Sequence, residues 1–327
     1  MSDLHSIVAP VFNEEDCIGV FHERMTEVMA GAEYEIIFVD DGSADRTPDI
    51  LEEIALADPH VRVVRFSRNF GHQAAITAGL DYARGDTVTS MDSDLQHPPE
   101  VVPKMIEEWR QGADVVFAVK QARHGESWAK KLNAKVYYRL LRAMTDTDIP
   151  ADASDFRLTG RVATDGLRAM REHGRYLRGL AGWVGMRRAF VYYESQPRHA
   201  GEAKYGMGRM LRLAWDGMLS FSVKPLRAIS TVGFVVAGFA VLYGIYAIAN
   251  HVAVGEDVPG WTSLITSMLF LGGLQLFALG LVGEYVARVL EEVRGRPLYL
   301  VAATYGFAEQ GAQSEPDRRS PAPRVTV

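Results

Sequence analysis

Acidic and polar residues follow three of the short apolar runs near the start of the chain. The segment after the first run holds Pro10, Asn13 and Glu14, and Asp40 and Asp41 end the second. The fourth run leads into an acidic turn, Asp92-Ser93-Asp94-Leu95-Gln96. Two carboxylates two residues apart can hold one hard divalent cation, and Mg²⁺ takes such oxygen ligands while sharing its shell with substrate phosphates. The pattern therefore indicates diphosphate binding through a metal ion.

Two common phosphate-binding motifs are absent from the sequence. No Gly-x-Gly-x-x-Gly follows the first run, which argues against a dinucleotide-dependent oxidoreductase, and no Walker lysine motif occurs. The phosphates of a bound nucleotide would then need a metal ion and arginines. An Asp-x-Asp turn alone is a weak indication, because acidic turns are common, so the elements around it matter.

Those elements alternate between strands and helices. Apolar runs rich in Val, Ile and Phe occupy residues 6–12, 34–40, 61–66, 87–91 and 114–119, with segments of helical periodicity between them. This alternation predicts an α/β, Rossmann-like domain with a mostly parallel sheet. Ligands of such sheets bind beyond the carboxyl ends of the strands, so the acidic segments are expected to meet at one edge.

The composition is that of a globular chain. Hydrophobic residues make up 48% and charged residues 23% of 327 residues, which excludes wholesale disorder and a many-span transporter. A formal net charge of -6 argues against a nucleic-acid partner. The single cysteine, Cys17, excludes an internal disulfide and suits a reducing compartment, and the N-terminus carries no export signal.

Two stretches without charged residues, 229–250 and 264–283, depart from this average composition. Each is long enough to cross the hydrocarbon core of a bilayer, which is about 30 Å thick. The link between them holds Glu256 and Asp257 and no basic residue, whereas Lys and Arg flank both stretches on the other side. The positive-inside rule therefore predicts a multi-pass protein of the cytoplasmic (inner) membrane, with both termini and the large N-terminal part in the cytoplasm.

The same patterns divide the chain into five parts. Apolar residues recur at helical spacing over residues 207–219, with basic residues between them, which favours a helix lying on the membrane surface. The C-terminal residues are rich in Gly, Gln, Ser, Pro and Arg, which favours disorder. We expect a cytoplasmic catalytic domain over 1–205, an amphipathic interfacial helix over 206–227, two transmembrane helices within 228–288 (about 229–250 and 264–285), a cytoplasmic juxtamembrane segment over 289–305 and a disordered tail over 306–327.

Six segments together resemble one known family. They are residues 39–47, 68–72, 91–100 and 154–158 in the N-terminal part, and 283–285 and 294–299 after the second stretch. On these motifs the chain resembles the family 2 glycosyltransferases of GT-A fold, in particular the polyisoprenyl-phosphate glycosyltransferases related to dolichyl-phosphate mannose synthase. The hydrophobic pair is similar to the membrane anchor of the bacterial branch. The resemblance spans residues 7–301.

The resemblance implies an activity, a cofactor and partners. A hexose is transferred with inversion from a nucleotide diphosphate sugar to a polyprenyl phosphate at the cytoplasmic membrane face, with UDP-glucose as the first expected donor and GDP-mannose as the second. Mg²⁺ or Mn²⁺ is the implied cofactor, because charge builds on the departing nucleotide. The implied partners are the nucleotide sugar, the lipid phosphate and the membrane, with no nucleic acid, and a homo-oligomer is left open.

The resemblance also assigns the site residues. It places Asp92, Asp94 and Gln96 at the metal, and Asp94 and Asp155 at the reaction. It assigns donor binding to Pro10, Asn13, Glu14, Asp40, Asp41, Asp92 and Ser93, and phosphate or acceptor binding to Arg123, Arg198 and Lys204. One departure concerns Ala203, which stands where relatives commonly have serine, so a hydroxyl contact to phosphate is lost.

The role of Asp155 depends on whether the acceptor has to lose a proton. A carboxylate in this place is usually described as the general base of inverting transfer. A phosphate monoester has its second pKa near about 6, so a lipid phosphate is already largely dianionic at neutral pH and needs little deprotonation. Asp155 would then orient a neighbouring group or stabilise the charge that develops on the sugar. The purely structural alternative is a salt bridge to Arg157 or another arginine.

Three other functions fit parts of the sequence. A metal-dependent phosphohydrolase would use an Asp-x-Asp nucleophile, but such motifs usually follow the first strand, and here the motif follows the fourth. A non-catalytic membrane protein that binds nucleotide sugars would not need the whole acidic set. A processive polysaccharide synthase is disfavoured because two spans are few for a channel and no Gln-x-x-Arg-Trp motif occurs.

Overall fold

The computed structural model describes residues 3–120, 153–194, 224–254 and 260–307. Its strands form one eight-stranded sheet in the order β7-β5-β6-β4-β1-β2-β3-β8. The strands are β1 (Leu4–Val11), β2 (Glu33–Asp40), β3 (Val61–Phe66), β4 (Thr87–Ser90), β5 (Val115–Lys120), β6 (Ala153–Gly160), β7 (Arg188–Tyr193) and β8 (Val301–Tyr305).

The centre of the sheet is parallel, as predicted. Strand β1 pairs in parallel with β2 and β4, and β2 pairs in parallel with β3. Strand β6 runs antiparallel to both β4 and β5, and β8 runs antiparallel to β3. Because Ser90 at the end of β4 pairs with Arg157 in the middle of β6, the residues of β6 before Arg157 lie at the carboxyl edge of the parallel strands.

Helices cover both faces of the sheet. They are α1 (Ile18–Val28), α2 (Thr47–Ala57), α3 (His72–Tyr82), α4 (Val102–Arg110, after the 3₁₀ turn η1, Pro99–Val101), α6 (Arg161–Ala169) and α7 (Leu177–Trp183). Neighbouring residues of β1 point to opposite faces: Ile7 packs in one core with Phe21 of α1, and Val8 packs in the other with Ile76 of α3. Helices α2 and α4 share the first core, and α6 and α7 share the second.

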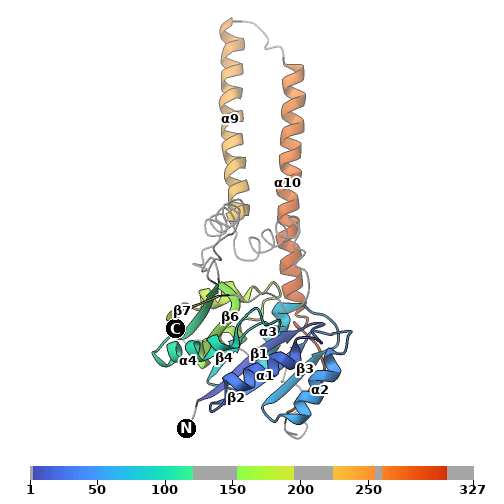
Figure 1. Cartoon of the computed structure of the whole chain (residues 1–327). Helices are drawn as coiled ribbons and strands as arrows, with labels where there is room; N and C mark the ends of the chain where they lie inside the picture. The colour runs from blue at the N-terminus through green and yellow to red at the C-terminus, as the bar shows by residue number, and fades with distance from the viewer. Residues whose placement is uncertain (1–2, 121–152, 195–223, 255–259, 308–327) are drawn as a thin grey trace, which may run out of the picture.

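Two long helices, α9 (Lys224–Val254) and α10 (Trp261–Arg294), project from the sheet domain (Figure 1). Both contain windows long and apolar enough to cross a membrane, Ile229–Tyr246 and Phe270–Arg294. At about 1.5 Å per residue, the 34 residues of α10 span about 51 Å, more than the hydrocarbon core needs. Helix α10 therefore extends out of a bilayer at one end.

Two of the predicted boundaries differ from the structure. Residues 224–227, which we assigned to an interfacial helix, are the first turn of α9, and the rest of that predicted helix, 206–223, lies outside the described residues. The segment predicted as juxtamembrane, 289–305, contains the last turns of α10 and then β8, a strand of the eight-stranded sheet. The physical reason is hydrogen bonding, because β8 satisfies the free edge of β3.

The first residues of the predicted tail are also packed. The Phe307 ring lies edge-on to Tyr82, 5.4 Å between centroids, and the Arg62 guanidinium lies 5.5 Å from the Phe307 ring centroid. Residues 308–327, the remainder of that segment, lie outside the described residues. The sheet domain thus includes chain from both sides of the membrane helices.

Candidate active site

The acidic turn after β4 is anchored by its apolar member. Leu95 is 2% exposed and belongs to the core, although its φ of 60° lies in the left-handed region. That conformation costs about 1–2 kcal/mol for a residue with a Cβ, and burial of the leucine side chain compensates for it. The Asp94 carboxylate accepts a hydrogen bond of 3.0 Å from the Gln96 N–H. Asp92, Asp94 and Gln96 remain partly exposed around this fixed turn.

The buried serine of the turn ties it to β1. Ser93 is 3% exposed, and its hydroxyl donates a hydrogen bond of 3.1 Å to the Pro10 carbonyl. The ends of β1 and β4 are therefore fixed to each other. Both residues were predicted to bind the donor, and in this structure their polar groups hold the strand ends together.

The loops after β1 and β2 are also joined. The Asn13 N–H donates to the Ser43 hydroxyl at 2.9 Å, and the Asn13 side-chain oxygen accepts from the Ala44 N–H at 2.9 Å. The Glu14 N–H donates to the Thr47 hydroxyl at 2.9 Å. Asn13 has a positive φ of 54°, which asparagine tolerates better than most residues. These contacts give the edge a preformed shape.

The two aspartates at the end of β2 are buried and support backbone. The Asp40 carboxylate accepts from the Ser43 N–H at 2.9 Å. The Asp41 carboxylate accepts from the N–H groups of Phe70 (2.7 Å) and Gly71 (3.0 and 3.2 Å). Burial raises the pKa of Asp41, and these two N–H donors oppose the shift. Asp40 and Asp41 lie at the predicted edge, where their carboxylates hold two loops in place.

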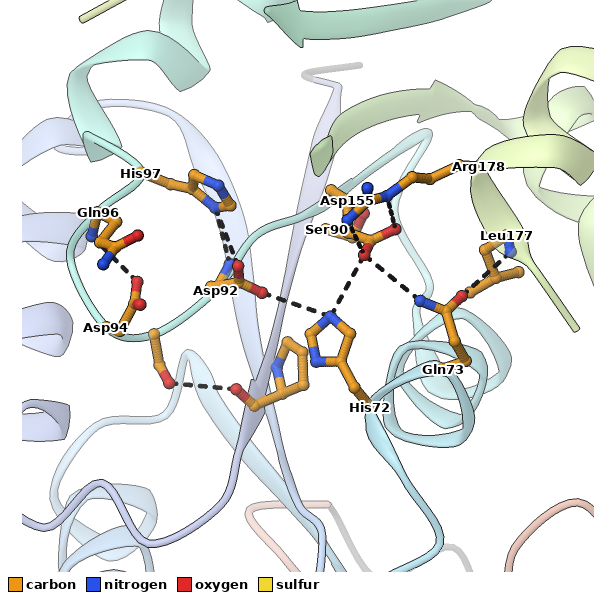
Figure 2. A network of polar contacts seen from close by, with 12 residues as sticks. His72, Gln73, Ser90, Asp92, Asp94, Gln96, His97, Asp155, Leu177 and Arg178 are labelled. Atoms are coloured by element: carbon orange, nitrogen blue, oxygen red, sulfur yellow. Dashed lines mark hydrogen bonds and ion pairs between the residues drawn. The ribbon is translucent and has the colours of Figure 1, made fainter. Parts of the chain in front are cut away.

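Asp155 lies at the same edge because β6 is antiparallel. Its carboxylate is bound by the Arg178 guanidinium of α7, with Nε donating to Oδ1 at 3.2 Å and Nη2 to Oδ2 at 2.9 Å (Figure 2). The Gln73 amide of α3 donates to Oδ2 at 3.4 Å, and its oxygen accepts from the Leu177 N–H at 3.1 Å. Helices α3 and α7 thus both hold this carboxylate.

Cations determine the protonation of Asp155. The residue is 5% exposed. Burial opposes its charged form, but the contacts with His72 and Arg178 outweigh burial and hold the pKa of the Asp155 carboxyl well below its usual range. The fully buried Arg157 adds positive charge, with its Nη2 4.0 Å from Oδ1. A carboxylate in this environment stays ionised and is a poor proton acceptor.

His72 lies between Asp155 and the acidic turn. Its Nε2 is 3.6 Å from Asp155 Oδ2 and 3.5 Å from Asp92 Oδ1, so one ring nitrogen faces two carboxylates (Figure 2). Burial opposes the charged imidazole, but these carboxylates outweigh burial and raise the pKa of His72. His72 thereby connects the predicted metal-binding turn with the predicted catalytic aspartate.

His97 supports the turn from the other side. Its Nδ1 accepts a hydrogen bond of 3.2 Å from the Asp92 N–H, and its ring stacks on Phe156 at 5.0 Å between centroids. Burial lowers the pKa of His97 despite the nearby aspartates. A neutral, buried ring whose Nδ1 accepts this hydrogen bond orients the Asp92 backbone.

The oxygen atoms of the acidic turn suit a divalent cation that is shared with a bound diphosphate. Within the described ranges, no group of three or more His, Cys, Asp or Glu side chains is arranged to hold a metal ion. Two partly exposed carboxylates and one amide oxygen are instead present at Asp92, Asp94 and Gln96. Mg²⁺ usually keeps part of its shell for water and substrate phosphates, so this set suits an ion that arrives with a diphosphate.

The structure brings most of the predicted residues together and adds others. Arg123, Arg198 and Lys204, predicted to bind phosphate or acceptor, lie outside the described residues. Sequence reasoning gave no role to Gln73 or Arg178. His72 lies in a motif that we noted, but only the antiparallel placement of β6 gives it Asp155 as a neighbour. Nothing in the spacing of Arg178 indicates its partner, because 23 residues separate the two.

A sheet of this order, with an acidic turn and a cation-bound aspartate at its carboxyl edge, defines a GT-A-type glycosyltransferase. Residues 6–167 match the model of glycosyl transferase family 2, and residues 224–289 match the GtrB C-terminal hairpin. The chain belongs to the family 2 glycosyltransferases that carry this hairpin. It is a transferase whose hairpin consists of α9 and most of α10.

Individual relatives match nearly the whole chain. An uncharacterised glycosyltransferase of Bacillus subtilis, YkcC, is 45% identical over 93% of this chain and 94% of its own. A prophage bactoprenol glucosyl transferase homolog of Escherichia coli K12 is 39% identical over 90% of this chain and 97% of its own. The crystal structure of glucosyl-3-phosphoglycerate synthase from Mycobacterium tuberculosis with Mn²⁺, UDP-glucose and glycerol 3-phosphate is 24% identical, covers 67% of this chain and 79% of its own, and gives a TM-score of 0.46.

Proposed function

We propose that this glycosyltransferase transfers glucose from UDP-glucose to bactoprenol phosphate at the cytoplasmic face of the membrane. The observation that carries the proposal is the joint presence of the acidic turn, the Asp155–Arg178 pair and the membrane hairpin in one chain. Relatives that match over most of their length are named bactoprenol glucosyl transferases, among them that of Shigella phage SfII, 39% identical over 92% of this chain. GDP-mannose remains the second donor to test.

The hairpin supports a reaction at the membrane surface. A lipid phosphate lies at the headgroup level, so a soluble sugar donor must meet it just outside the hydrocarbon core. The last turns of α10 and strand β8 join the membrane helices to the catalytic sheet. Basic residues flank the hairpin on the side of the catalytic domain and are absent from the link between the spans, which favours a cytoplasmic catalytic domain.

The donor would bind across the joined loops of β1, β2 and β4. Asp92, Asp94 and Gln96 would hold the divalent ion, which supplies a Lewis acid for the charge that develops on the departing UDP. The exposed Asn13 and the half-buried Glu14 form the rim of the site. The buried Asp40 and Asp41 keep the loops in shape for the nucleoside. Phe12 is 46% exposed at the end of β1 and offers an aromatic surface at this rim.

The lipid phosphate would act as the nucleophile without a protein base. One of its oxygens forms a bond to the anomeric carbon while the bond from that carbon to the UDP oxygen breaks, which inverts the configuration. Asp155 stays ionised, so its role is to orient Arg178 and His72 and to stabilise the positive charge that develops on the sugar. Arg123, Arg198 and Lys204 would add cations for the acceptor phosphate.

One experiment tests the donor, the acceptor and the reaction class together. Purified full-length protein is incubated with undecaprenyl phosphate and a panel of labelled nucleotide sugars, and label in the organic phase is counted. We expect label from UDP-glucose. Transfer from GDP-mannose alone would show that the donor is GDP-mannose and not UDP-glucose. Release of phosphate without nucleotide sugar would indicate the phosphohydrolase alternative. Binding of donor without transfer to any lipid would indicate a non-catalytic binding protein.

A further inference from the structure

The cytoplasmic end of α10 is bound to the segment between α6 and α7. The Glu292 carboxylate accepts a hydrogen bond of 3.0 Å from the His173 N–H and lies 3.3 Å from Nδ1 of the same residue. The other ring nitrogen, Nε2, lies 2.8 Å from the Arg296 carbonyl oxygen. One histidine of the catalytic domain therefore contacts the last turn of the membrane helix and Arg296, two residues beyond its end.

A second set of contacts binds the end of α3 to the chain that follows α10. The Arg171 guanidinium donates to both oxygens of Asp81 at 2.7 and 2.9 Å. The Tyr299 hydroxyl donates to the same carboxylate at 2.7 Å, and the Tyr299 ring stacks on Phe66 at 5.0 Å between centroids. Asp81 is thus shared between the α6–α7 segment and the segment that returns from the membrane.

These two contact sets lie on the elements that hold Asp155. Helix α3 begins with His72 and Gln73, which contact the Asp155 carboxylate, and its last turn carries Asp81. The segment that carries Arg171 and His173 continues directly into α7, whose second residue is Arg178. A displacement of α10 would therefore reach the catalytic carboxylate through both of its supports.

We propose that His173 and Asp81 are positioning residues that couple the membrane hairpin to the catalytic centre. Through them the end of α10 and the returning segment fix α7 and α3, and hence Arg178, Gln73 and His72, against Asp155. The hairpin then acts on turnover as well as on membrane binding. The proposal rests on the proposed function for its acceptor. The coupling concerns the geometry of Asp155 with any donor and acceptor pair.

The energetics distinguish coupling from simple stabilisation. The Glu292 side chain is 51% exposed and the His173 side chain 24% exposed. A polar contact as exposed as this one contributes little to stability, so its loss should leave the fold intact. Displacement of a catalytic group by about 1 Å can lower the rate about 100-fold. Loss of coupling therefore predicts a large change in turnover beside a small change in melting temperature.

The test compares two adjacent glutamates of α10 in full-length protein in phospholipid nanodiscs. Glu292→Gln removes the charge that faces His173, and Glu291→Gln removes that of its exposed neighbour as the matched control. We expect E292Q to lower kcat at least about tenfold, with donor KM within about twofold of wild type and melting temperature unchanged. E291Q should match wild type in all three. Equal kcat for E292Q and E291Q would overturn the proposal.

A second measurement covers the case in which a variant is unstable or no acceptor turns over. Hydrogen exchange of residues 170–178 should be faster in E292Q and in Tyr299→Phe than in E291Q, while exchange in β1 and β2 is unchanged. This readout needs no product, so it separates failure of the coupling from failure of the proposed acceptor. Unchanged exchange over 170–178 in both variants would overturn the coupling even if glucosyl transfer is confirmed.

Discussion

Arg178 binds both oxygens of Asp155, with Nε 3.2 Å from Oδ1 and Nη2 2.9 Å from Oδ2. Such a two-point contact fixes the orientation of a carboxylate as well as its charge. Gln73 and His72 approach Oδ2 from α3, at 3.4 and 3.6 Å. The carboxylate of Asp155, which is commonly assigned the role of base, is therefore already bound by hydrogen-bond donors and cations. Its contribution to transfer follows from what it holds in place.

Asp155→Asn should abolish most turnover while donor binding persists. The amide cannot accept both guanidinium bonds, so Arg178 and Arg157 lose their counter-charge, and we expect kcat to fall about 100-fold or more. Stability should fall by about 1–3 kcal/mol, less than for a fully buried pair, because the Arg178 side chain is 34% exposed. Turnover is measured with labelled donor, and donor affinity by calorimetry.

The matched control for this substitution is Asp165→Asn. Asp165 also pairs with arginine, Arg168 at 2.8 Å, but its side chain is 52% exposed on α6 and lies outside the site. We expect wild-type kcat and a stability change within about 1 kcal/mol. Unchanged turnover in D155N would reject Asp155 as a catalytic group, and equal losses in both variants would reject a specific role for its pair with Arg178.

The pH dependence should follow the acceptor rather than Asp155. The folded-state pKa of Asp155 is depressed, so its pairing contributes stability at all pH values above its unfolded pKa, about 3.9, and loses it only as pH falls through the folded value. Between about pH 5 and 8 Asp155 stays ionised. We therefore expect the acid limb of kcat/KM for the acceptor near its second ionisation, about pH 6.

An acceptor analogue checks this assignment. A polyprenyl phosphonate is a weaker acid at its second ionisation, so the acid limb should move to higher pH when it replaces the phosphate. Donor kcat/KM measured at saturating acceptor serves as the control, since it does not include ionisation of the free acceptor. An acid limb that stays in place when the acceptor is changed would assign it to a group on the protein.

Removal of the metal should stop transfer and be reversible. Chelation by EDTA is expected to eliminate product, and added Mg²⁺ or Mn²⁺ to restore it, because two carboxylates of the turn would otherwise face the donor diphosphate without a cation. Asp94→Asn should lower kcat about 100-fold or more, and the D92N/D94N double variant should yield no product. Asp49→Asn, an exposed aspartate in the first turn of α2, is the control. Glycolipid formation by the double variant at the wild-type rate would contradict the metal assignment.

The strand pattern and the acidic turn could be predicted from the sequence because both are local. The five predicted strands correspond to β1–β5 with shifts of at most two residues at their ends, since buried parallel strands read as continuous apolar runs. Asp92 and Asp94 follow one of these strands directly, so the topology of a parallel sheet places them at the edge.

The remaining features depend on pairings that no local pattern encodes. Strand β6 runs antiparallel to its neighbours, and this alone brings Asp155 beside the turn. Strand β8 follows a 34-residue membrane helix yet pairs with β3, whose edge would otherwise lack hydrogen bonds. Arg178 reaches Asp155 from the short helix α7, which follows β6 in the chain after α6 and packs against it. These contacts are fixed by tertiary packing, and residue types at a given spacing do not distinguish their partners.

Two glycines with the same backbone constraint allow a final test of the loop architecture. Gly42 has a φ of +73°, and a Cβ there would lie 2.5 Å from the Arg68 carbonyl carbon, whereas Gly31 has a φ of +89° with nothing within 4 Å. Gly42→Ala and Gly31→Ala should each lower the free energy of unfolding by about 1–2 kcal/mol, because alanine is strained in the left-handed conformation. Only G42A must also displace the chain that Asp41 supports, so we expect its donor KM to rise at least about tenfold, equivalent to about 1.4 kcal/mol, and that of G31A to stay at the wild-type value. Donor KM and denaturation midpoints measured on both variants separate backbone cost from loop displacement, and equal KM values would show that donor binding does not depend on this loop.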